Sequence, residues 1–272
     1  MPRHPVPTKR VADVKMKDVN EESVTASNRM IISLDFGTVN SKAAYTTVDA
    51  TTAVNQLKQN SFDLQVIGDI DFDNQPTMPT IMAYHQGEWS FGNRVNSLIS
   101  ASSLPASKKI SLMKLGLAEA AYTKETNSRL DRQLKELPDV IGVKTRQDLV
   151  VIFLREFHQQ VRAKISSAFG MKDIWKTHKV ETLLTIPACW KLEMIGMMKA
   201  AAQVAGLENV KLISEPEAPA MYFMYSRQVA AGPLVPAGPL GRPLAASSEP
   251  FVLLDVGGGT AVRFPKHSLW PT

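Results

Sequence analysis

Two stretches far apart in the chain share one layout, in which an apolar run ends in an acid and continues into a turn of small residues. Residues 31–34 precede Asp35-Phe36-Gly37-Thr38, and residues 251–254 precede Asp255-Val256-Gly257-Gly258-Gly259-Thr260. Glycine lets bare backbone N–H groups approach phosphate oxygens, and the threonine hydroxyl can bond them. A single copy is typical of an ordinary hairpin turn. Two copies, each after an apolar strand, predict two phosphate-binding loops that face one nucleotide.

The composition is that of a globular domain with a sizeable core. The 272 residues are 44% hydrophobic and 21% charged, which suits one large domain or two small ones. No stretch reaches the roughly 18 apolar residues of a membrane span, and the N-terminus lacks the apolar segment of a secretion signal. We therefore expect no membrane partner and a cytoplasmic location. The single cysteine, Cys189, suits a reducing compartment and is expected to be a buried, small, apolar side chain.

The charge pattern argues against two further classes of function. The net charge is +5, but Lys and Arg are scattered among Asp and Glu, which is typical of a solvated surface and not of a nucleic-acid-binding patch. The five histidines show none of the spacings of a zinc site. They are His4, His85, His158, His178 and His267.

Three segments differ in character along the first and last parts of the chain. Residues 1–29 are polar and proline-containing and read as a disordered tail. The region 30–83 predicts a strand, a turn, a strand, a loop and a strand, with residues 41–47 pairing back on the first strand across Gly37. Residues 229–250 repeat Ala-Gly-Pro-Leu and predict a Pro/Gly-rich loop without regular structure.

A long helix is predicted in the middle of the chain. It starts with a capping box at residues 145–148 and stops at Gly170. Its apolar stripe has helical spacing and indicates core packing. The stripe consists of Leu149, Ile152, Phe153, Phe157, Val161 and Ile165.

After this helix the pattern predicts a strand, a helix and a strand. The segment 180–186 predicts a buried strand, the helix at 190–205 is closed by Gly206, and the second strand covers 210–214. A strand-helix-strand unit of this kind forms parallel sheets. We therefore expect an α/β fold with a mixed sheet, because the hairpin at the beginning of the chain is antiparallel.

Four stretches in this order resemble the heat-shock protein 70 family in its divergent, fungal-type branch. They are Ile32-Ser33-Leu34-Asp35-Phe36-Gly37-Thr38; Thr185-Ile186-Pro187-Ala188-Cys189-Trp190 with Ala205-Gly206-Leu207; Leu212-Ile213-Ser214-Glu215-Pro216-Glu217-Ala218; and Asp255-Val256-Gly257-Gly258-Gly259-Thr260. The resemblance covers roughly residues 30–260. It implies lobe I of an actin-like ATPase, a ribonuclease-H-like fold with flanking helices, and the cofactors ATP and Mg²⁺.

The resemblance also implies where the nucleotide is held. Two sets of residues would cradle its phosphates from opposite sides. The first set is Gly37, Thr38, Val39 and Asn40, and the second is Gly257, Gly258, Gly259 and Thr260.

The resemblance assigns catalytic roles to a few charged residues. Lys114 is similar to the family's catalytic lysine, which places a positive charge against the transferred phosphoryl group, although a solvated loop lysine is the plain alternative. Glu215 and Asp255 are similar to the acids that orient the attacking water and the hydrated magnesium. Asp35 would lie near the same ion, which keeps its waters and needs carboxylates just outside the first shell. Thr260 joins this set because its hydroxyl can bond a phosphate oxygen.

The resemblance ends abruptly near residue 261. Val262 stands where the family has an acid, and Pro265 ends the return strand. We expect lobe I at 30–228, a phosphate-loop strand and turn at 251–264, and a tail outside the family pattern at 265–272. The second lobe, with the adenosine contacts, is expected to be missing, so little or no hydrolysis is expected. A short form and a truncated gene product are both compatible with this ending.

Two other functions stay open at this point. Sugar kinases of the actin-like superfamily share the Asp-x-Gly-Thr loop, so a small-molecule kinase is one alternative, although Glu215-Pro216-Glu217-Ala218 favours the heat-shock branch. A catalytically inactive interaction module is the other. The family's partners are a nucleotide, unfolded protein and co-chaperones.

Overall fold

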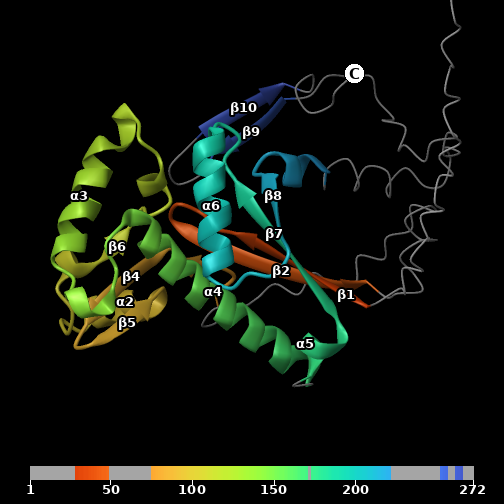
Figure 1. The fold of residues 1–272 in the computed structure, drawn as a ribbon, viewed down its shortest axis with the longest axis horizontal. Coiled ribbons are helices and arrows are strands. Elements are labelled where there is room, and N and C mark those ends of the chain that lie inside the picture. Colours follow the sequence, from red (N-terminus) through yellow and green to blue (C-terminus); the bar gives the residue numbers. More distant parts are fainter. Residues whose placement is uncertain (1–27, 49–74, 171–172, 222–251, 257–260, 266–272) are drawn as a thin grey trace, which may run out of the picture.

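The computed structural model describes residues 28–48, 75–170, 173–221, 252–256 and 261–265 (Figure 1). Expectations for the tail at 1–27, the loop at 229–250, the turn at 257–260 and the final residues 266–272 lie outside the described residues. The strands are β1 (Arg29–Asp35), β2 (Asn40–Val48), β3 (Met78–Pro79), β4 (Ile81–His85), β5 (Glu88–Phe91), β6 (Ile110–Ser111), β7 (Lys179–Ile186), β8 (Val210–Ser214), β9 (Val252–Val256) and β10 (Ala261–Pro265).

The described chain has both α-helices and 3₁₀ helices. The α-helices are α2 (Asn93–Ser100), α3 (Lys124–Lys135), α4 (Arg146–Phe169), α5 (Ile174–Thr177) and α6 (Leu192–Val204), and residues 217–221 are also helical. Four short 3₁₀ helices connect them. These are η1 (Ala106–Lys108), η2 (Leu115–Leu117), η3 (Ala121–Thr123) and η4 (Asp139–Ile141).

The central element is a mixed five-stranded sheet with the strand order β3-β2-β1-β7-β8. β2 runs antiparallel to β1 and β3 pairs antiparallel to β2, whereas β7 and β8 run parallel to β1. The predicted hairpin across Gly37 and the predicted parallel strand-helix-strand unit are both confirmed. The register sets Asp35 opposite Lys42 in β2, and Leu34 opposite Leu184 in β7.

One face of this sheet is packed against α4 and α6, which lie side by side in front of it in Figure 1. Met30, Ile32 and Leu34 alternate with half-buried residues along β1 and are fully buried in the main core. Phe36 continues the same face, because its ring lies 5.6 Å from that of Phe153 on α4. Asp35 therefore lies on the face of β1 that is turned away from α4.

Helix α4 has the two ends that its sequence predicts. Thr145 accepts a hydrogen bond from the Asp148 backbone N–H, and the Asp148 carboxylate accepts one from the Thr145 N–H. At the other end Gly170 has φ +56°, the left-handed conformation of a C-terminal glycine. Helix α6 begins two residues later than predicted, at Leu192, because Trp190 is held in a turn by a bond from its N–H to the Pro187 carbonyl.

A second, smaller sheet lies on the left of Figure 1, next to α2 and α3. Its strand order is β5-β4-β6. Gln86 and Gly87 both have positive φ and form the two-residue turn between β4 and β5, as hairpin twist favours. The sequence patterns predicted none of β5, β6, α2 or α3.

The strands β9 and β10 form a two-stranded sheet of their own, drawn beyond the upper end of α6 in Figure 1. They pair antiparallel from Ala261 opposite Val256 to Pro265 opposite Val252. The predicted return strand is therefore present, is five residues long and ends at Pro265.

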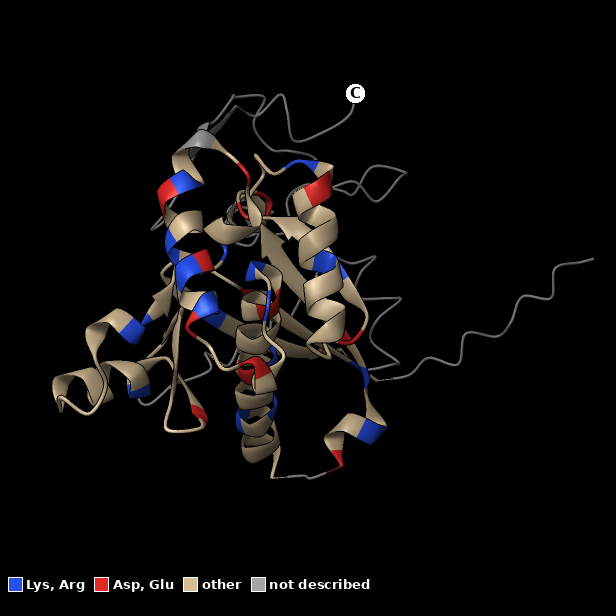
Figure 2. Cartoon of the chain, turned by 60° about the vertical axis from the view of Figure 1, so that its left-hand side comes forward, with Lys and Arg blue, Asp and Glu red and all other residues tan. Residues whose placement is uncertain are grey.

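The surface carries both signs of charge and scattered apolar residues. Figure 2 shows acidic and basic residues interspersed over the described elements. Glu181 on β7 lies between Arg29 on β1 and Lys211 on β8, at 2.7 Å from each. The hydrogen bond from Lys211 is the main cause that holds the pKa of Glu181 below its usual value, and Arg29 adds to it, although burial acts in the opposite direction. None of the described helices is long and apolar enough to cross a membrane.

Candidate functional site

The candidate site lies where the parallel strands of the main sheet end. β1 ends at Asp35, β7 at Ile186 and β8 at Ser214, and all three carboxyl ends meet at one edge because the strands are parallel neighbours. The first predicted phosphate turn follows β1, and Glu215 follows β8 directly. Residues that are 180 positions apart in the chain are thereby brought to one edge.

The turn after β1 has a fixed and tightly folded backbone. The Gly37 N–H donates to the Asp35 carbonyl over 3.1 Å, and the Thr80 N–H donates to the Val39 carbonyl over 2.7 Å. A Cβ on Gly37 would lie 2.0 Å from the carbonyl oxygen of Asn40, so only glycine fits here. Val39 and Asn40 are exposed. The turn thus offers its outer side to a ligand, as a phosphate-binding turn requires.

The carboxylate of Asp35 is oriented by the neighbouring strand. Its Oδ1 accepts a hydrogen bond of 2.7 Å from the hydroxyl of Thr185 on β7. Asp35 itself is half-buried. The second carboxylate oxygen keeps its capacity as an acceptor, and a carboxylate with a fixed direction can bind a water molecule of a hydrated ion.

Lys114 and Glu215 form an ion pair, although they are 101 positions apart in the chain. Lys114 is only 1% exposed, so the solvated loop lysine is the wrong interpretation of this residue. Its ammonium also lies 5.8 Å from the ring centres of Phe36 and Trp190. The Glu215 N–H donates to the Ile186 carbonyl over 2.8 Å, which continues the pairing of β8 with β7 and places Glu215 at the strand ends.

One oriented carboxylate, that of Asp35, is what the described strand edge offers to a cation. Among the described residues, no group of three or more His, Cys, Asp and Glu side chains is gathered that could hold a metal ion. Mg²⁺ keeps several waters and is often bound through one or two carboxylates and phosphates of a substrate. Asp35, with its oriented and half-buried carboxylate, fits that role.

The second predicted phosphate turn is described only in part. Asp255 lies in β9, where it pairs with Val262 of β10. The expected ligands Gly257, Gly258, Gly259 and Thr260 lie outside the described residues. Whether both turns face one nucleotide, and whether Asp255 joins Asp35 at one ion, therefore stay predictions.

Cys189 and Trp190, in the turn after β7, differ in burial. Cys189 was expected to be buried, but it is an exposed free thiol, because the turn that holds Trp190 leaves the Cys189 side chain on the outside. Trp190 is buried in the core, and its ring centre lies 5.8 Å from the ammonium of Lys114. The sequence did not predict the Thr185 contact with Asp35. A hydroxyl one residue before the end of that strand was the available signal.

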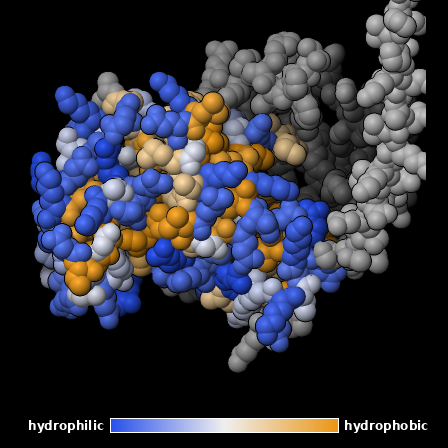
Figure 3. Space-filling model, in the orientation of Figure 1, coloured by the Kyte–Doolittle hydropathy of each residue, from blue (hydrophilic) through white to orange (hydrophobic). Residues whose placement is uncertain are grey.

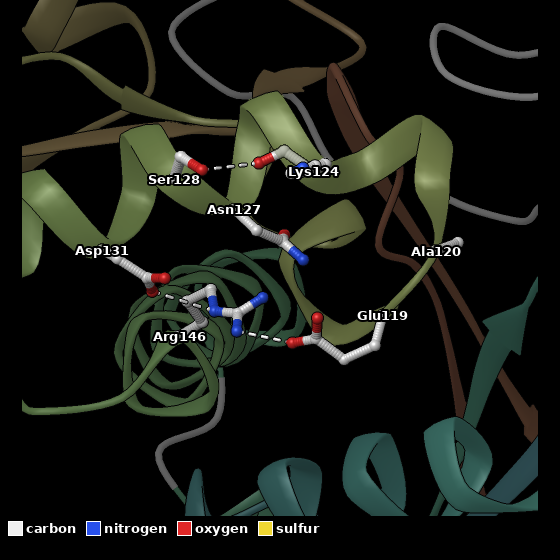
Figure 4. Close-up of a pocket in the computed structure, with 7 residues that line it drawn as sticks. All are labelled: Glu119, Ala120, Lys124, Asn127, Ser128, Asp131 and Arg146. Carbon is white, nitrogen blue, oxygen red and sulfur yellow. Dashed lines mark hydrogen bonds and ion pairs between the residues drawn. The ribbon is translucent and has the colours of Figure 1, made fainter.

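Cavities lie elsewhere on the described part of the molecule, and three of them are large. One of about 480 Å³ lies between α3, the start of α4 and the η2–η3 segment (Figure 4). A second, of about 880 Å³, lies between the β3 region and α2, and a third, of about 370 Å³, lies between β5, the start of α2 and α4. Asp35, Gly37, Lys114 and Glu215 line none of these three cavities.

No model of a known protein family matches the chain, and no curated protein matches it.

Proposed function

We propose that this chain is a nucleotide-binding lobe of the actin-like, ribonuclease-H-like type, similar to the heat-shock protein 70 ATPase, and that it binds MgATP at the strand edge described above. The observation that carries the proposal is the Lys114–Glu215 pair. Two residues that the motifs assign to phosphoryl chemistry, far apart in the chain, are placed together beside the Gly37 turn.

The topology of the sheet supports this location. From β1 the chain continues on one side to β2 and β3, and it returns on the other side of β1 to β7 and β8. In open α/β sheets, ligands bind outside the carboxyl ends of the strands at such a change of direction. Asp35 and Thr185 lie on the two strands that flank this point.

Each group then has a role that its chemistry allows. The N–H groups of the turn, apart from that of Gly37, which donates to the Asp35 carbonyl, bind phosphate oxygens, and Lys114 supplies a positive charge to the terminal phosphate. Glu215 holds Lys114 until the phosphate competes for it, and then orients the attacking water. Mg²⁺, when bound, neutralises phosphate charge, and Asp35 would hold one of its waters.

We expect weak binding and negligible turnover of the chain by itself. The Gly37 turn is open to solvent at Val39, which is 44% exposed, whereas phosphoryl transfer depends on positioning and exclusion of water. The dissociation constant for MgATP should be about high micromolar, where each factor of ten corresponds to about 1.4 kcal/mol.

Calorimetric titration with MgATP tests the proposal. Lys114→Met should weaken binding at least about tenfold, because a charge-assisted phosphate contact is lost. Lys108→Met is the matched control, since Lys108 forms an exposed ion pair with Glu136 and should leave binding unchanged. Absence of binding at millimolar MgATP, or equal binding by the Lys114→Met variant, would overturn the proposal. A nanomolar dissociation constant for MgATP would contradict the expectation of weak binding at a solvent-exposed site.

An inactive interaction module is the second candidate. Leu192, at the N-terminal end of α6, is 86% exposed, and Val39 is exposed at the same sheet edge. Figure 3 shows apolar surface over that end of α6. In the proposed chaperone setting, unfolded protein or a co-chaperone in the cytoplasm would be the partner. Concentration-dependent self-association that Leu192→Ser abolishes, in a chain without MgATP binding, would favour this candidate.

A further inference from the structure

Lys114 is carried by a segment that cannot fix its own position. The two-residue strand β6 precedes it, and the single-turn helix η2 follows it. The internal bonds of this segment are short-range, such as Gly116 N–H to the Met113 carbonyl over 3.0 Å. A lysine that must meet a phosphate within a fraction of an ångström needs support from outside such a segment.

Arg146, the first residue of α4, supplies contacts from outside. One terminal nitrogen of its guanidinium donates to the Gly116 carbonyl over 3.1 Å. The other terminal nitrogen pairs with Glu119 at 2.5 Å, and Nε pairs with Asp131 of α3 at 3.0 Å. Figure 4 shows the guanidinium between these two carboxylates at the cavity between α3 and α4. One planar group thus joins α4, α3 and the segment that carries Lys114.

The same segment is packed closely at the bonded residue. A Cβ on Gly116 would lie 2.7 Å from Cδ1 of Leu130 and 3.6 Å from Cβ of Arg146. Two residues later, the Ala118 carbonyl accepts bonds from Thr123 Oγ1 over 2.7 Å and from Asn127 Nδ2 over 3.0 Å. Side chains from α3, α4 and η3 therefore hold the two carbonyl groups on either side of Leu117.

We propose that Arg146 is a positioning residue for Lys114: by holding the Gly116 carbonyl it sets where the Lys114 ammonium lies relative to Glu215 and to a bound phosphate. The role of the phosphate rests on the proposed function, whereas the coupling of Arg146 to Lys114 does not. Loss of the Arg146 contacts should loosen the η2 turn locally and expose the lysine.

Lysine acetylation read by mass spectrometry measures this coupling directly. The rate at Lys114 is normalised to that at Lys176, whose side chain is 81% exposed. In Arg146→Gln the normalised rate should rise about tenfold, which corresponds to about 1.4 kcal/mol of easier local opening. Arg162→Gln is the matched control, because Arg162 also lies on α4, pairs with Glu208 at 2.5 Å and stacks 4.0 Å from Trp175. Its Lys114 rate should stay within about twofold of the unmodified chain.

The variant Arg146→Lys and a measurement of global stability distinguish local loosening around Lys114 from unfolding of the whole chain. Arg146→Lys retains the charge, but its compact ammonium cannot reach all three acceptors that surround the planar guanidinium, so its Lys114 rate should be intermediate. Urea unfolding of each variant separates local loosening from global loss of stability. Lys114 rates in both Arg146 variants equal to that of Arg162→Gln would overturn the inference.

Measurements of MgATP binding by the same variants separate the role of Arg146 from the proposed function. If the unmodified chain binds MgATP, Arg146→Gln should weaken binding about threefold to tenfold and have no further effect in the Lys114→Met background. Additive effects of the two substitutions would overturn the coupling. If the unmodified chain binds no MgATP, the proposed function fails, and the acetylation rates still decide the role of Arg146.

Discussion

The hydroxyl of Thr185 donates a hydrogen bond of 2.7 Å to Oδ1 of Asp35, from the end of β7 to the end of β1. Both side chains lie on the sheet face away from α4, next to the register pair Leu34 and Leu184. The bond gives the acid of the proposed phosphate turn a fixed direction. In the proposed function, preorganisation of this kind would lower the cost of binding a hydrated ion.

Removal of the buried ammonium should destabilise the fold. Lys114→Met leaves the Glu215 carboxylate without its partner in a site where its side chain is only 19% exposed. We expect a loss of about 2–4 kcal/mol in the free energy of unfolding, measured by urea denaturation. Lys114→Met combined with Glu215→Gln should recover part of this loss, since no unpaired charge is then left. A double variant less stable than the single one would contradict this account.

Gly37 and Gly196 should respond to alanine in opposite ways. A Cβ at Gly37 would overlap the Asn40 carbonyl, so Gly37→Ala must distort the turn after β1, with an expected loss of more than about 2 kcal/mol in the free energy of unfolding. At Gly196, inside α6, a Cβ would meet nothing within 4 Å. Gly196→Ala should therefore stabilise the chain by about 0.5–1 kcal/mol. Thermal unfolding of the pair tests both signs together.

The capping box of α4 should be measurable by itself. Thr145→Ala removes the acceptor of the Asp148 N–H and should cost about 1 kcal/mol, whereas Thr145→Ser should cost little. Burial raises the pKa of Asp148, but bonds from the Lys144 N–H and from Thr145 outweigh it and lower the pKa overall. Stability from this carboxylate is therefore present above its unfolded pKa near 4 and is lost as the pH falls below that value. Below about pH 4 the free energy of unfolding should therefore decrease less steeply with falling pH in Thr145→Ala than in Thr145→Ser.

His158 should make stability depend on pH. Burial lowers the pKa of His158 to about 4, and the charge of Arg162 adds to this, while Glu208 opposes it. Its Nε2 is buried and has no hydrogen-bond partner among the described residues. Between about pH 6.5 and 4 the unfolded chain binds a proton at this histidine that the folded chain does not bind. The free energy of unfolding therefore decreases as the pH is lowered, by up to about 1.4 kcal/mol per pH unit. In His158→Met the free energy of unfolding, measured with urea, should depend less on pH in this range. If the unmodified chain and the variant show the same pH dependence, His158 is not the titrating group.

Much of the main sheet follows from local sequence signals. The capping box, the apolar stripe of α4 and the glycine at its end specify that helix without reference to the rest of the fold. The smaller sheet and α3 carry weaker signals. In α3 only Leu130 and Leu134 are apolar and buried, so its helical period is hidden among polar residues.

The site was predictable in its residues but only partly in its contacts. Motifs identified Asp35, Lys114 and Glu215, yet nothing local indicates that Lys114 is buried or that it pairs with Glu215. The same holds for Arg146, which looks like an ordinary residue at the start of a helix. Such contacts depend on the fold bringing distant segments together, which no spacing in the sequence reports.

The partners Asp35 and Thr185 are 150 positions apart, and this separation has a consequence for the order of folding during synthesis. The β1–β2 hairpin is local and can form soon after it leaves the ribosome, whereas β7 emerges much later. At about 5–20 residues per second the delay is roughly 8–30 s. During that time one edge of β1 has no neighbour and can pair with another chain. A nascent chain of this protein should therefore need protection by a ribosome-associated factor until residue 186 has emerged, and crosslinking of ribosome-bound nascent chains that end before and well beyond that point can test this.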